Sequence, residues 1–377
     1  MTSPLDQDAS ETARDLARAV IIHGPISRSE LGRRLHLSPA SLTRLSKPFI
    51  ERGLFFEASE VSVGPGRPAR PLDVRVEARR FVGVKLTGEA AVAVLTDLRA
   101  TALKRAERPL LDHQVETVVR AIAELVAELR RPDFAIDFLG VSVGGNVAEQ
   151  RVVARAPFLD WRNVDLAGHL EGELGLPVAV ENDVVALTTA EHWFGAVRGA
   201  PAFAVVTIGA GVGYGLVLHD RVVSTADSGL GLGGHLPLDP SGPLCMQGHR
   251  GCSTAMLSIP SIKAQVATAL GREVTYQEVL DLARASHPVA AAVTEAGGRA
   301  LGRMMTMIAN IAMIDTIVLA GDGVALWDVA SKAAIEAMRI DRDPEASPIA
   351  VHVDTSGFDS WARGAAAIAI QNSVERL

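Results

Sequence analysis

The sequence has few cysteines and no hydrophobic leader. Cys245 and Cys252 are its only cysteines, which excludes a fold held together by disulfides. The N-terminus is acidic and lacks the apolar run of a signal peptide, so we expect a cytoplasmic protein. Charged residues make up 21% of the chain and hydrophobic residues 48%. This balance excludes general disorder and is typical of a well-packed globular protein.

Only one uncharged stretch, residues 199–218, has about the length of a membrane span. It contains Pro201 and has glycine at positions 209, 211, 213 and 215. Alternating glycines break a helix and suit two strands joined by a tight loop. The sequence therefore predicts no transmembrane segment and no membrane partner.

The charge is unevenly distributed along the 377 residues, a length that predicts two or three domains. Residues 1–80 hold 13 Lys and Arg against 10 Asp and Glu, a balance of +3. The remainder holds 24 against 34, a balance of −10. This asymmetry indicates a nucleic-acid-binding module attached to an acidic body.

The start of the chain has the signals of consecutive short helices. Residues 11–23 predict a helix that is closed by Gly24-Pro25. Ser27 and Glu30 have the spacing of a capping box, in which a hydroxyl and a carboxylate satisfy free amides at a helix start. The second helix should end near Leu35, before a tight turn.

A third helix is predicted from the Ser38 cap, with Pro39 at its first position. Leu42, Leu45 and Phe49 share one face, which should meet a core. The opposite face carries small, hydroxyl and basic side chains, namely Ala40, Ser41, Thr43, Arg44 and Lys47. Such a face lets a helix lie deep in a major groove while an arginine reaches a base edge or phosphate. The alternative is a small helical domain whose charges are only solvated.

Residues 54–63 alternate as a strand, and residues 64–70 form a Gly/Pro-rich hairpin tip that carries Arg67 and Arg70. An extended basic arm suits the narrow minor groove, where the negative potential is strongest. Residues 1–80 are therefore predicted to be a winged helix-turn-helix domain that binds double-stranded operator DNA.

The body of the chain repeats one plan. Residues 81–98 read as strand, turn and strand, and residues 202–220 repeat this pattern. Two such hairpins predict a duplicated α/β architecture with a cleft between its halves. Further elements are predicted as helices over 115–129, 262–270, 277–285, 289–313 and from 360, and as strands over 138–143, 176–180, 316–320 and 349–354. The strand over 176–180 delivers Glu181-Asn182-Asp183 at its end, where α/β proteins place their chemistry.

The loop over residues 229–252 brings three metal-ligating side chains together in the sequence. His235, Cys245 and Cys252 could supply three of the four ligands of a tetrahedral zinc site. The intervening residues 239–243 supply a turn that folds them together. The alternative is that both cysteines are merely small buried apolar residues.

These features resemble the ROK family of repressors and sugar kinases over nearly the whole chain. The family's zinc loop, GHx9CxCGxxGC, is matched by Gly234-His235, Cys245, Gly248 and Gly251-Cys252. The resemblance implies a structural zinc. Gln247 replaces the family's third thiolate and is a poor zinc ligand, so His249 could substitute for it, and a metal-free loop stays open.

The family's kinase motifs are only partly kept. Kinases of the family carry DxGGT in the first hairpin, where residues 85–89 read Lys-Leu-Thr-Gly-Glu, so Lys85 replaces the acid and Glu89 would repel a phosphate. The second glycine turn, residues 207–213, is kept. Asp183 matches the family's catalytic base, here expected to be vestigial, and Asn182 matches a sugar-hydroxyl ligand. Because of the departures at Lys85 and Glu89, we expect no kinase activity and no ATP.

Two of the family's sugar-binding glutamates are replaced, by Leu232 and Thr254. A pocket without them loses hydroxyl acceptors that each contribute about 1–3 kcal/mol. The effector is therefore expected to be an atypical or phosphorylated sugar, or to be absent. The expected ligand contacts are Asn182, Asp183, His235 and Thr254.

The resulting prediction is a ROK-type transcriptional regulator, a repressor and not an enzyme, that senses a carbohydrate-like effector as a homodimer or homotetramer. Its fold class is α/β, with a two-lobed actin-like (ribonuclease H-like) body behind the winged helix. The predicted domains are 1–80, 81–190 completed by 360–377, and 191–359. The alternatives are a sugar kinase carrying a DNA-binding head and a ligand-independent regulator with a decayed pocket.

Overall fold

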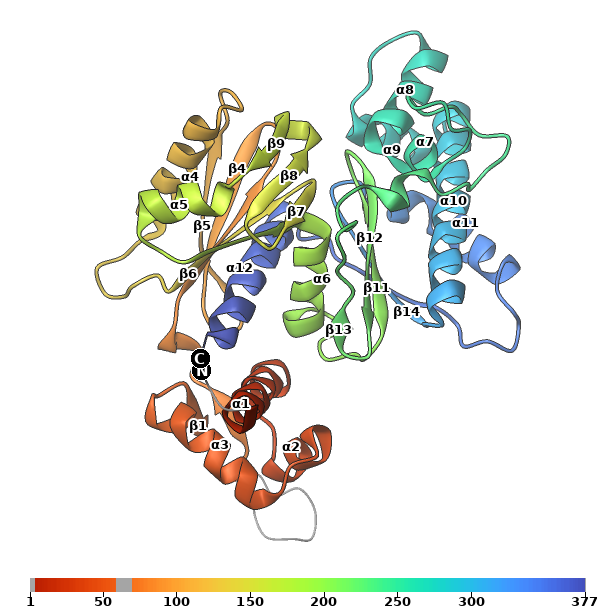
Figure 1. Cartoon of the computed structure of the whole chain (residues 1–377). Helices are drawn as coiled ribbons and strands as arrows, with labels where there is room; N and C mark the ends of the chain where they lie inside the picture. The colour runs from red at the N-terminus through yellow and green to blue at the C-terminus, as the bar shows by residue number, and fades with distance from the viewer. Residues whose placement is uncertain (1–3, 59–69, 377) are drawn as a thin grey trace. The chain divides into compact units, whose positions relative to one another are not determined.

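A computed structural model describes residues 4–58 and 70–376 of the chain (Figure 1). The chain forms two compact units: residues 1–199 with 361–377, and residues 200–360. The first 80 residues belong to the first unit. The predicted division into three domains stays a prediction.

Three helices open the first unit: α1 (Pro4–His23), α2 (Arg28–Leu35) and α3 (Pro39–Glu51). The predicted caps form, because the Ser27 hydroxyl accepts the Glu30 amide at 3.1 Å and the Ser38 hydroxyl accepts the Ser41 amide at 3.2 Å. The Glu30 carboxylate, predicted to complete the capping box, forms ion pairs with Arg33 and Arg34. The helix predicted from residue 11 begins earlier, at Pro4.

Two short strands follow the helices, β1 (Phe55–Glu57) and β2 (Leu72–Val74). They pair antiparallel, with Phe56 opposite Asp73. Residues 64–69 of the predicted hairpin tip, Arg67 among them, lie outside the described residues, whereas Arg70 is described and exposed. The described part is consistent with the base of the predicted wing.

A five-stranded sheet forms the centre of the first unit, in the order β10-β6-β3-β4-β5. Its strands are β3 (Phe81–Leu86), β4 (Ala90–Thr96), β5 (Ala102–Pro109), β6 (Phe138–Val143) and β10 (Val178–Asn182). Strands β3, β4 and β5 pair antiparallel with their neighbours, and β6 and β10 run parallel to β3. A smaller sheet holds β7 (Asn146–Ala148), β8 (Val152–Ala156) and β9 (Trp161–Val164), and short 3-10 turns are η1 (Val76–Ala78) and η2 (Pro157–Leu159).

Four helices accompany this sheet: α4 (Val115–Leu129), α5 (Leu166–Leu174), α6 (Asp183–Phe194) and α12 (Phe358–Glu375). The α4 and α5 side of the sheet forms one hydrophobic core, in which Val82, Val84 and Ile122 are fully buried. The opposite side meets α12 so closely that a Cβ on Gly140 would lie 1.9 Å from the Ala365 carbonyl oxygen. Helix α12 therefore packs with its backbone almost directly on the strands.

The second unit repeats the strand plan of the first, in the order β13-β12-β11-β14-β15. The strands are β11 (Phe203–Ile208), β12 (Val212–Leu218), β13 (Arg221–Val222), β14 (Thr316–Ala320) and β15 (Ala350–Val353). Strands β11, β12 and β13 again pair antiparallel, and β14 and β15 run parallel to β11. The predicted duplicated α/β architecture is confirmed.

The helical elements of the second unit are η3 (Leu232–His235), α7 (Ser253–Leu257), α8 (Ile259–Leu270), α9 (Tyr276–Arg284), α10 (Pro288–Ala312) and α11 (Leu326–Ile340). One apolar core includes Val206 of β11, Met305 of α10 and Ala334 of α11. None of the helices in the described part of the chain has the length and apolar character needed to cross a membrane.

Candidate functional site

Helix α3 presents the polar face that the sequence predicts. Leu42, Leu45 and Phe49 are buried, at 1%, 9% and 5% exposure. On the other face Ala40, Thr43, Arg44 and Lys47 are exposed, and Ser41 is half-buried. The apolar residues thus fix the helix to the core and leave a continuous face available to a partner.

The charged side chains on this face differ in their contacts. Lys47 lies 3.7 Å from Glu51, one helical turn away. Within the described residues, Arg44 has no ion-pair partner. Pro48 lies inside α3, where the sequence prediction places no interruption of the helix. Because proline has no N–H, the Arg44 carbonyl lacks its usual helical donor.

Asn182 caps the start of α6, at the end of β10. Its side-chain oxygen accepts the amides of Val184 at 3.0 Å and Val185 at 3.1 Å. Its side-chain nitrogen donates to the Gly145 carbonyl at 2.8 Å and to Asp183 at 3.2 Å. An asparagine amide has two donors and two acceptor lone pairs, so this side chain, 4% exposed, is fully engaged within the protein. Its predicted contact with a ligand stays a prediction.

Asp183 forms a buried ion pair that the sequence did not predict. The Lys85 Nζ donates to Asp183 Oδ2 at 2.5 Å, and Asp183 Oδ1 accepts the Val184 amide at 2.9 Å. The side chains of Lys85 and Asp183 are only 7% and 16% exposed. The Lys85 Nζ also lies 5.2 Å from the centre of the Trp361 ring. The one available signal was a lysine inside an otherwise apolar strand.

The first hairpin turn satisfies its own amides. The Thr87 hydroxyl accepts the amides of Glu89 at 3.1 Å and Ala90 at 2.9 Å, and donates to the Ala90 carbonyl at 3.0 Å. Backbone amides that are bonded in this way are not available to a phosphate. This geometry adds to the sequence difference at Lys85 and Glu89.

Glu181, next to the capping Asn182, is a buried carboxyl at 7% exposure. It accepts the Asn182 amide at 2.8 Å and the Gln150 side-chain nitrogen at 3.0 Å. Burial raises its pKa, and these two hydrogen bonds only partly oppose that shift.

The 229–252 loop brings four metal-ligating side chains together. The ligand atoms of His235, Cys245, His249 and Cys252 all lie within 4.8 Å of one another. The sulfurs of Cys252 and Cys245 lie 3.5 and 3.9 Å from His235 Nδ1, and Cys245 lies 3.6 Å from His249 Nδ1. Tetrahedral zinc with bonds of about 2.0 Å to nitrogen and 2.3 Å to sulfur would place such atoms roughly 3.5 Å apart. The donor set therefore fits the metal.

The pKa shifts of these residues do not all act in the same direction on metal binding. Burial raises the pKa of Cys245, but hydrogen bonds from the backbone of Gln247 and His249 outweigh it and lower that pKa to about 7. Burial raises the pKa of Cys252 and lowers that of His235. Thiolate and neutral imidazole are the forms that bind metals, so the shifts of Cys245 and His235 favour a metal, whereas the raised pKa of Cys252 opposes it.

The loop is folded by tight backbone contacts at the predicted turn. Asp239 accepts the Ser241 amide at 2.9 Å, and the Gly251 carbonyl accepts the amides of Leu238 and Asp239, both at 2.9 Å. Gly251 has φ of 53°, and a Cβ there would lie 1.6 Å from the Asp239 carbonyl oxygen. Glycine at this position is required for Cys252 to approach His235.

The predicted effector contacts come from both units of the chain. Asn182 and Asp183 belong to the first unit, and His235 and Thr254 belong to the second. Thr254, in α7, donates its hydroxyl hydrogen to the Gly234 carbonyl at 2.6 Å, next to His235. Within each unit the predicted residues are neighbours.

Comparison with known proteins finds relatives in the ROK family, both by family model and by sequence identity. The model of the ROK family matches residues 81–372. The N-acetylglucosamine repressor of Escherichia coli is 27% identical over 321 residues, covering 81% of this chain and 79% of that protein.

Solved structures share the fold. The chain matches a ROK family transcriptional regulator, described as a homolog of the E. coli Mlc protein, with a TM-score of 0.81 and 23% identity over 98% of this chain and 97% of that one. It also matches a ROK glucokinase from Streptomyces griseus with a TM-score of 0.66 and 24% identity, over 77% and 99% of the two chains. The family match extends over most of the sequence, and this chain belongs to the ROK family.

Proposed function

We propose that this protein is a transcriptional repressor that binds operator DNA through α3 and its wing and responds to a carbohydrate-like effector. The proposal is carried by the exposed face of α3, where Arg44 is a cation without an ion-pair partner among the described residues. The similarity to the N-acetylglucosamine repressor, which extends over most of the chain, supports the proposal. We further propose a homodimer or homotetramer, because paired recognition helices read symmetric operators.

DNA binding is tested with a duplex selected from random sequences by its affinity for the full-length protein. Arg44→Ala should weaken binding to this duplex by about 1–3 kcal/mol, as expected for one lost base contact. Arg131→Ala is the matched control, since Arg131 is an exposed arginine paired with Asp133 in the body. Equal affinity of the wild type and Arg44→Ala would refute the groove assignment.

The body is proposed to bind a ligand without phosphorylating it. Lys85 donates directly to the oxygen of Asp183 that would otherwise be free to accept a sugar hydroxyl. The turn at Thr87 leaves fewer free amides for phosphates. The decisive assay is ATP turnover with a panel of sugars. Phosphorylation that disappears in Asp183→Asn would instead support a sugar kinase carrying a DNA-binding head.

Effector binding is proposed to involve Asn182, Asp183, His235 and Thr254. A ligand that binds two conformations with different affinity shifts their populations and thereby changes DNA affinity. Calorimetric titration with neutral sugars and sugar phosphates, followed by operator affinity with and without each binder, tests this coupling. If no sugar binds, a ligand-independent regulator is the better description.

We propose a structural zinc held by His235, Cys245, His249 and Cys252, with Gln247 outside the ligand set. When bound, the ion would cross-link η3, through His235, to the later part of the 229–252 loop. Elemental analysis of the native protein should find one zinc per chain. His249→Ala should lower zinc affinity by at least about tenfold, whereas the control Gln247→Ala should keep it. The reverse pattern would show that position 247 supplies the fourth ligand.

A further inference from the structure

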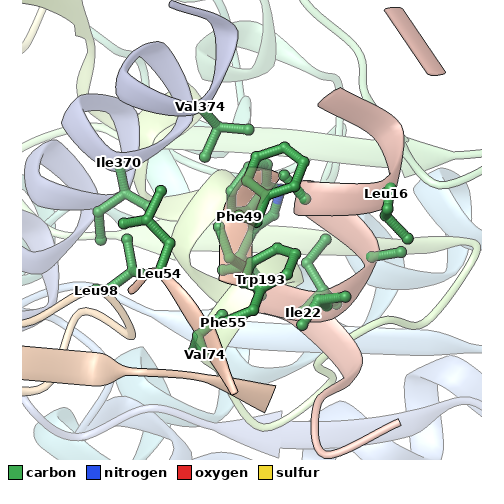
Figure 2. Close-up of a cluster of buried hydrophobic side chains, with 14 of the residues drawn as sticks. Leu16, Ile22, Phe49, Leu54, Phe55, Val74, Leu98, Trp193, Ile370 and Val374 are labelled. Atoms are coloured by element: carbon green, nitrogen blue, oxygen red, sulfur yellow. The ribbon is translucent and has the colours of Figure 1, made fainter. Parts of the chain in front are cut away.

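The described part of residues 1–80, here called the N-terminal segment or head, shares a hydrophobic core with the rest of the first unit, here called the lobe. Figure 2 shows Leu16, Ile22 and Phe55 of the N-terminal segment in one cluster with Trp193 and Ile370 of the lobe. Trp193, in α6, is 2% exposed. The guanidinium of Arg18 in α1 lies 5.9 Å from the centre of its ring. The N-terminal segment is thus packed against the C-terminal end of α6.

Arg99 adds a polar connection at the same boundary. It lies in the turn between β4 and β5, which is fixed because the Asp97 carboxylate accepts the amides of Arg99 and Thr101 at 2.8 and 2.9 Å. The Arg99 Nη2 donates to Asp73 in β2 at 2.5 Å and to the Gly24 carbonyl after α1 at 2.8 Å. One side chain therefore connects the lobe to two elements of the N-terminal segment.

Arg363 of α12 connects this turn to α6. Its Nε donates to the Ala100 carbonyl at 3.0 Å, and its Nη2 donates to the Phe194 carbonyl at 2.7 Å. Ala100 directly follows Arg99, and Phe194 is the last residue of α6. The guanidinium thus bonds both to the turn that carries Arg99 and to the end of the helix that carries Trp193.

The N-terminal ends of α6 and α12 lie at the Lys85–Asp183 pair. Asp183 is the first residue of α6, and Trp361, two residues before Arg363, lies against Lys85. The two helices are in close contact, since a Cβ on Gly364 would lie 2.9 Å from the backbone of Ala186 and Leu187. Helices in such contact move together rather than deform.

We propose that Arg363 and Arg99 are positioning residues that couple the N-terminal end of α6, at Asp183, to the orientation of the DNA-binding head. Helix α6 spans the distance from the ion pair to the head, with Asp183 at its N-terminal end and Trp193, which contacts the head, near its C-terminal end. Arg363 fixes the C-terminal end of this helix to the turn of Arg99, and Arg99 holds Asp73 and Gly24 of the head. The inference rests on the proposed DNA binding by α3.

Hydrogen exchange followed by mass spectrometry tests the coupling on the full chain, with and without the selected operator duplex. DNA should slow exchange in α3, which it contacts, and also in α12 and in α6 as far as its N-terminal end at Asp183, which it does not contact. Coupling energies between sites of 1–3 kcal/mol correspond to slowing by about 5- to 150-fold. Protection of α3 without protection of α6 and α12 would overturn the inference and leave the proposed function intact. Absence of protection at α3 would contradict both.

The variant Arg363→Met should separate the two effects. It keeps an unbranched stem in place of the arginine stem and removes both hydrogen bonds, so DNA should still protect α3 but no longer α6. The exposed Arg131→Met should behave as the wild type. Persistent protection of α6 in Arg363→Met would assign the coupling to the apolar contacts and refute the positioning by Arg363. The wild-type comparison decides the main point even if this variant folds poorly.

Discussion

A single lysine changes the chemistry at the start of α6. Lys85 and Asp183 are a nearly buried ion pair, and removing one partner of such a pair leaves a charge with poor solvation. Lys85→Met should therefore destabilise the protein by about 3 kcal/mol. The double variant Lys85→Met/Asp183→Asn should recover much of this loss, because it removes both charges.

The measurement is urea unfolding at neutral pH for the wild type, both single variants and the double variant. A double-mutant cycle isolates the interaction between the two side chains. Additive losses would mean that the pair contributes no coupling energy and that the 2.5 Å contact is not maintained in solution.

Glu181 provides a pH-dependent test at the same strand end. Burial raises the pKa of its carboxyl in the folded protein. Below about pH 4 it is protonated in both the folded and the unfolded chain. As pH rises, the unfolded chain ionises first, so the contribution of Glu181 to stability falls until pH passes its folded pKa.

Glu181→Gln removes this titration while keeping an acceptor oxygen. The variant should gain about 1 kcal/mol on the wild type at pH 7, and the difference should shrink toward pH 4. Thermal unfolding of both proteins over this pH range gives the comparison. A difference that is constant with pH would show that Glu181 is ionised in the folded state as readily as in the unfolded chain.

At the scale of elements, the contact between α12 and the first sheet depends on glycine. A Cβ on Gly140 would lie 1.9 Å from the Ala365 carbonyl oxygen, so Gly140→Ala must displace α12 and should cost about 3 kcal/mol. Gly172, inside α5, has no neighbouring atom within 4 Å of an added Cβ. Gly172→Ala should instead stabilise by about 0.5–1 kcal/mol, because alanine favours a helix over glycine. Chemical denaturation of both variants compares them, and equal signs would contradict the close packing.

The elements that could be predicted from the sequence are those with a clear local pattern. The antiparallel hairpins of both units and the caps of α2 and α3 match their predictions. Helix α6 escaped because its residues from Val185 to Trp193 are all buried, so no polar stripe marks a helical period. Strand β5 escaped for the opposite reason: six of its eight residues are exposed at the edge of the sheet, which obscures any apolar alternation.

The candidate site was only partly predictable for a similar physical reason. The proposed metal ligands lie in one short loop, so their spacing alone suggested the site, with His249 as a substitute ligand. The Lys85–Asp183 pair joins residues 98 positions apart. No local pattern reports such a contact, because it arises only when β3 and β10 become neighbours of β6 in the sheet.

At the scale of the whole molecule, one strand plan is used twice and supports different chemistry in each unit. The first unit carries α3 and the Lys85–Asp183 pair, and the second carries the His/Cys loop. DNA and metal ions should therefore act on the stability of different units, since a ligand stabilises the part of the chain to which it binds.

Scanning calorimetry of the full chain can separate these effects. Operator duplex at about 100 times its Kd should stabilise the first unit by about 2.7 kcal/mol, which raises its unfolding temperature by several degrees. Removal of zinc with a chelator should lower the transition of the second unit and leave the first in place, because the four ligands all belong to residues 235–252. His249→Ala should reproduce the effect of the chelator without added reagent. If DNA and chelator instead shift one common transition, the two units unfold as one cooperative unit, and the assignment of each ligand's effect to a separate unit is wrong.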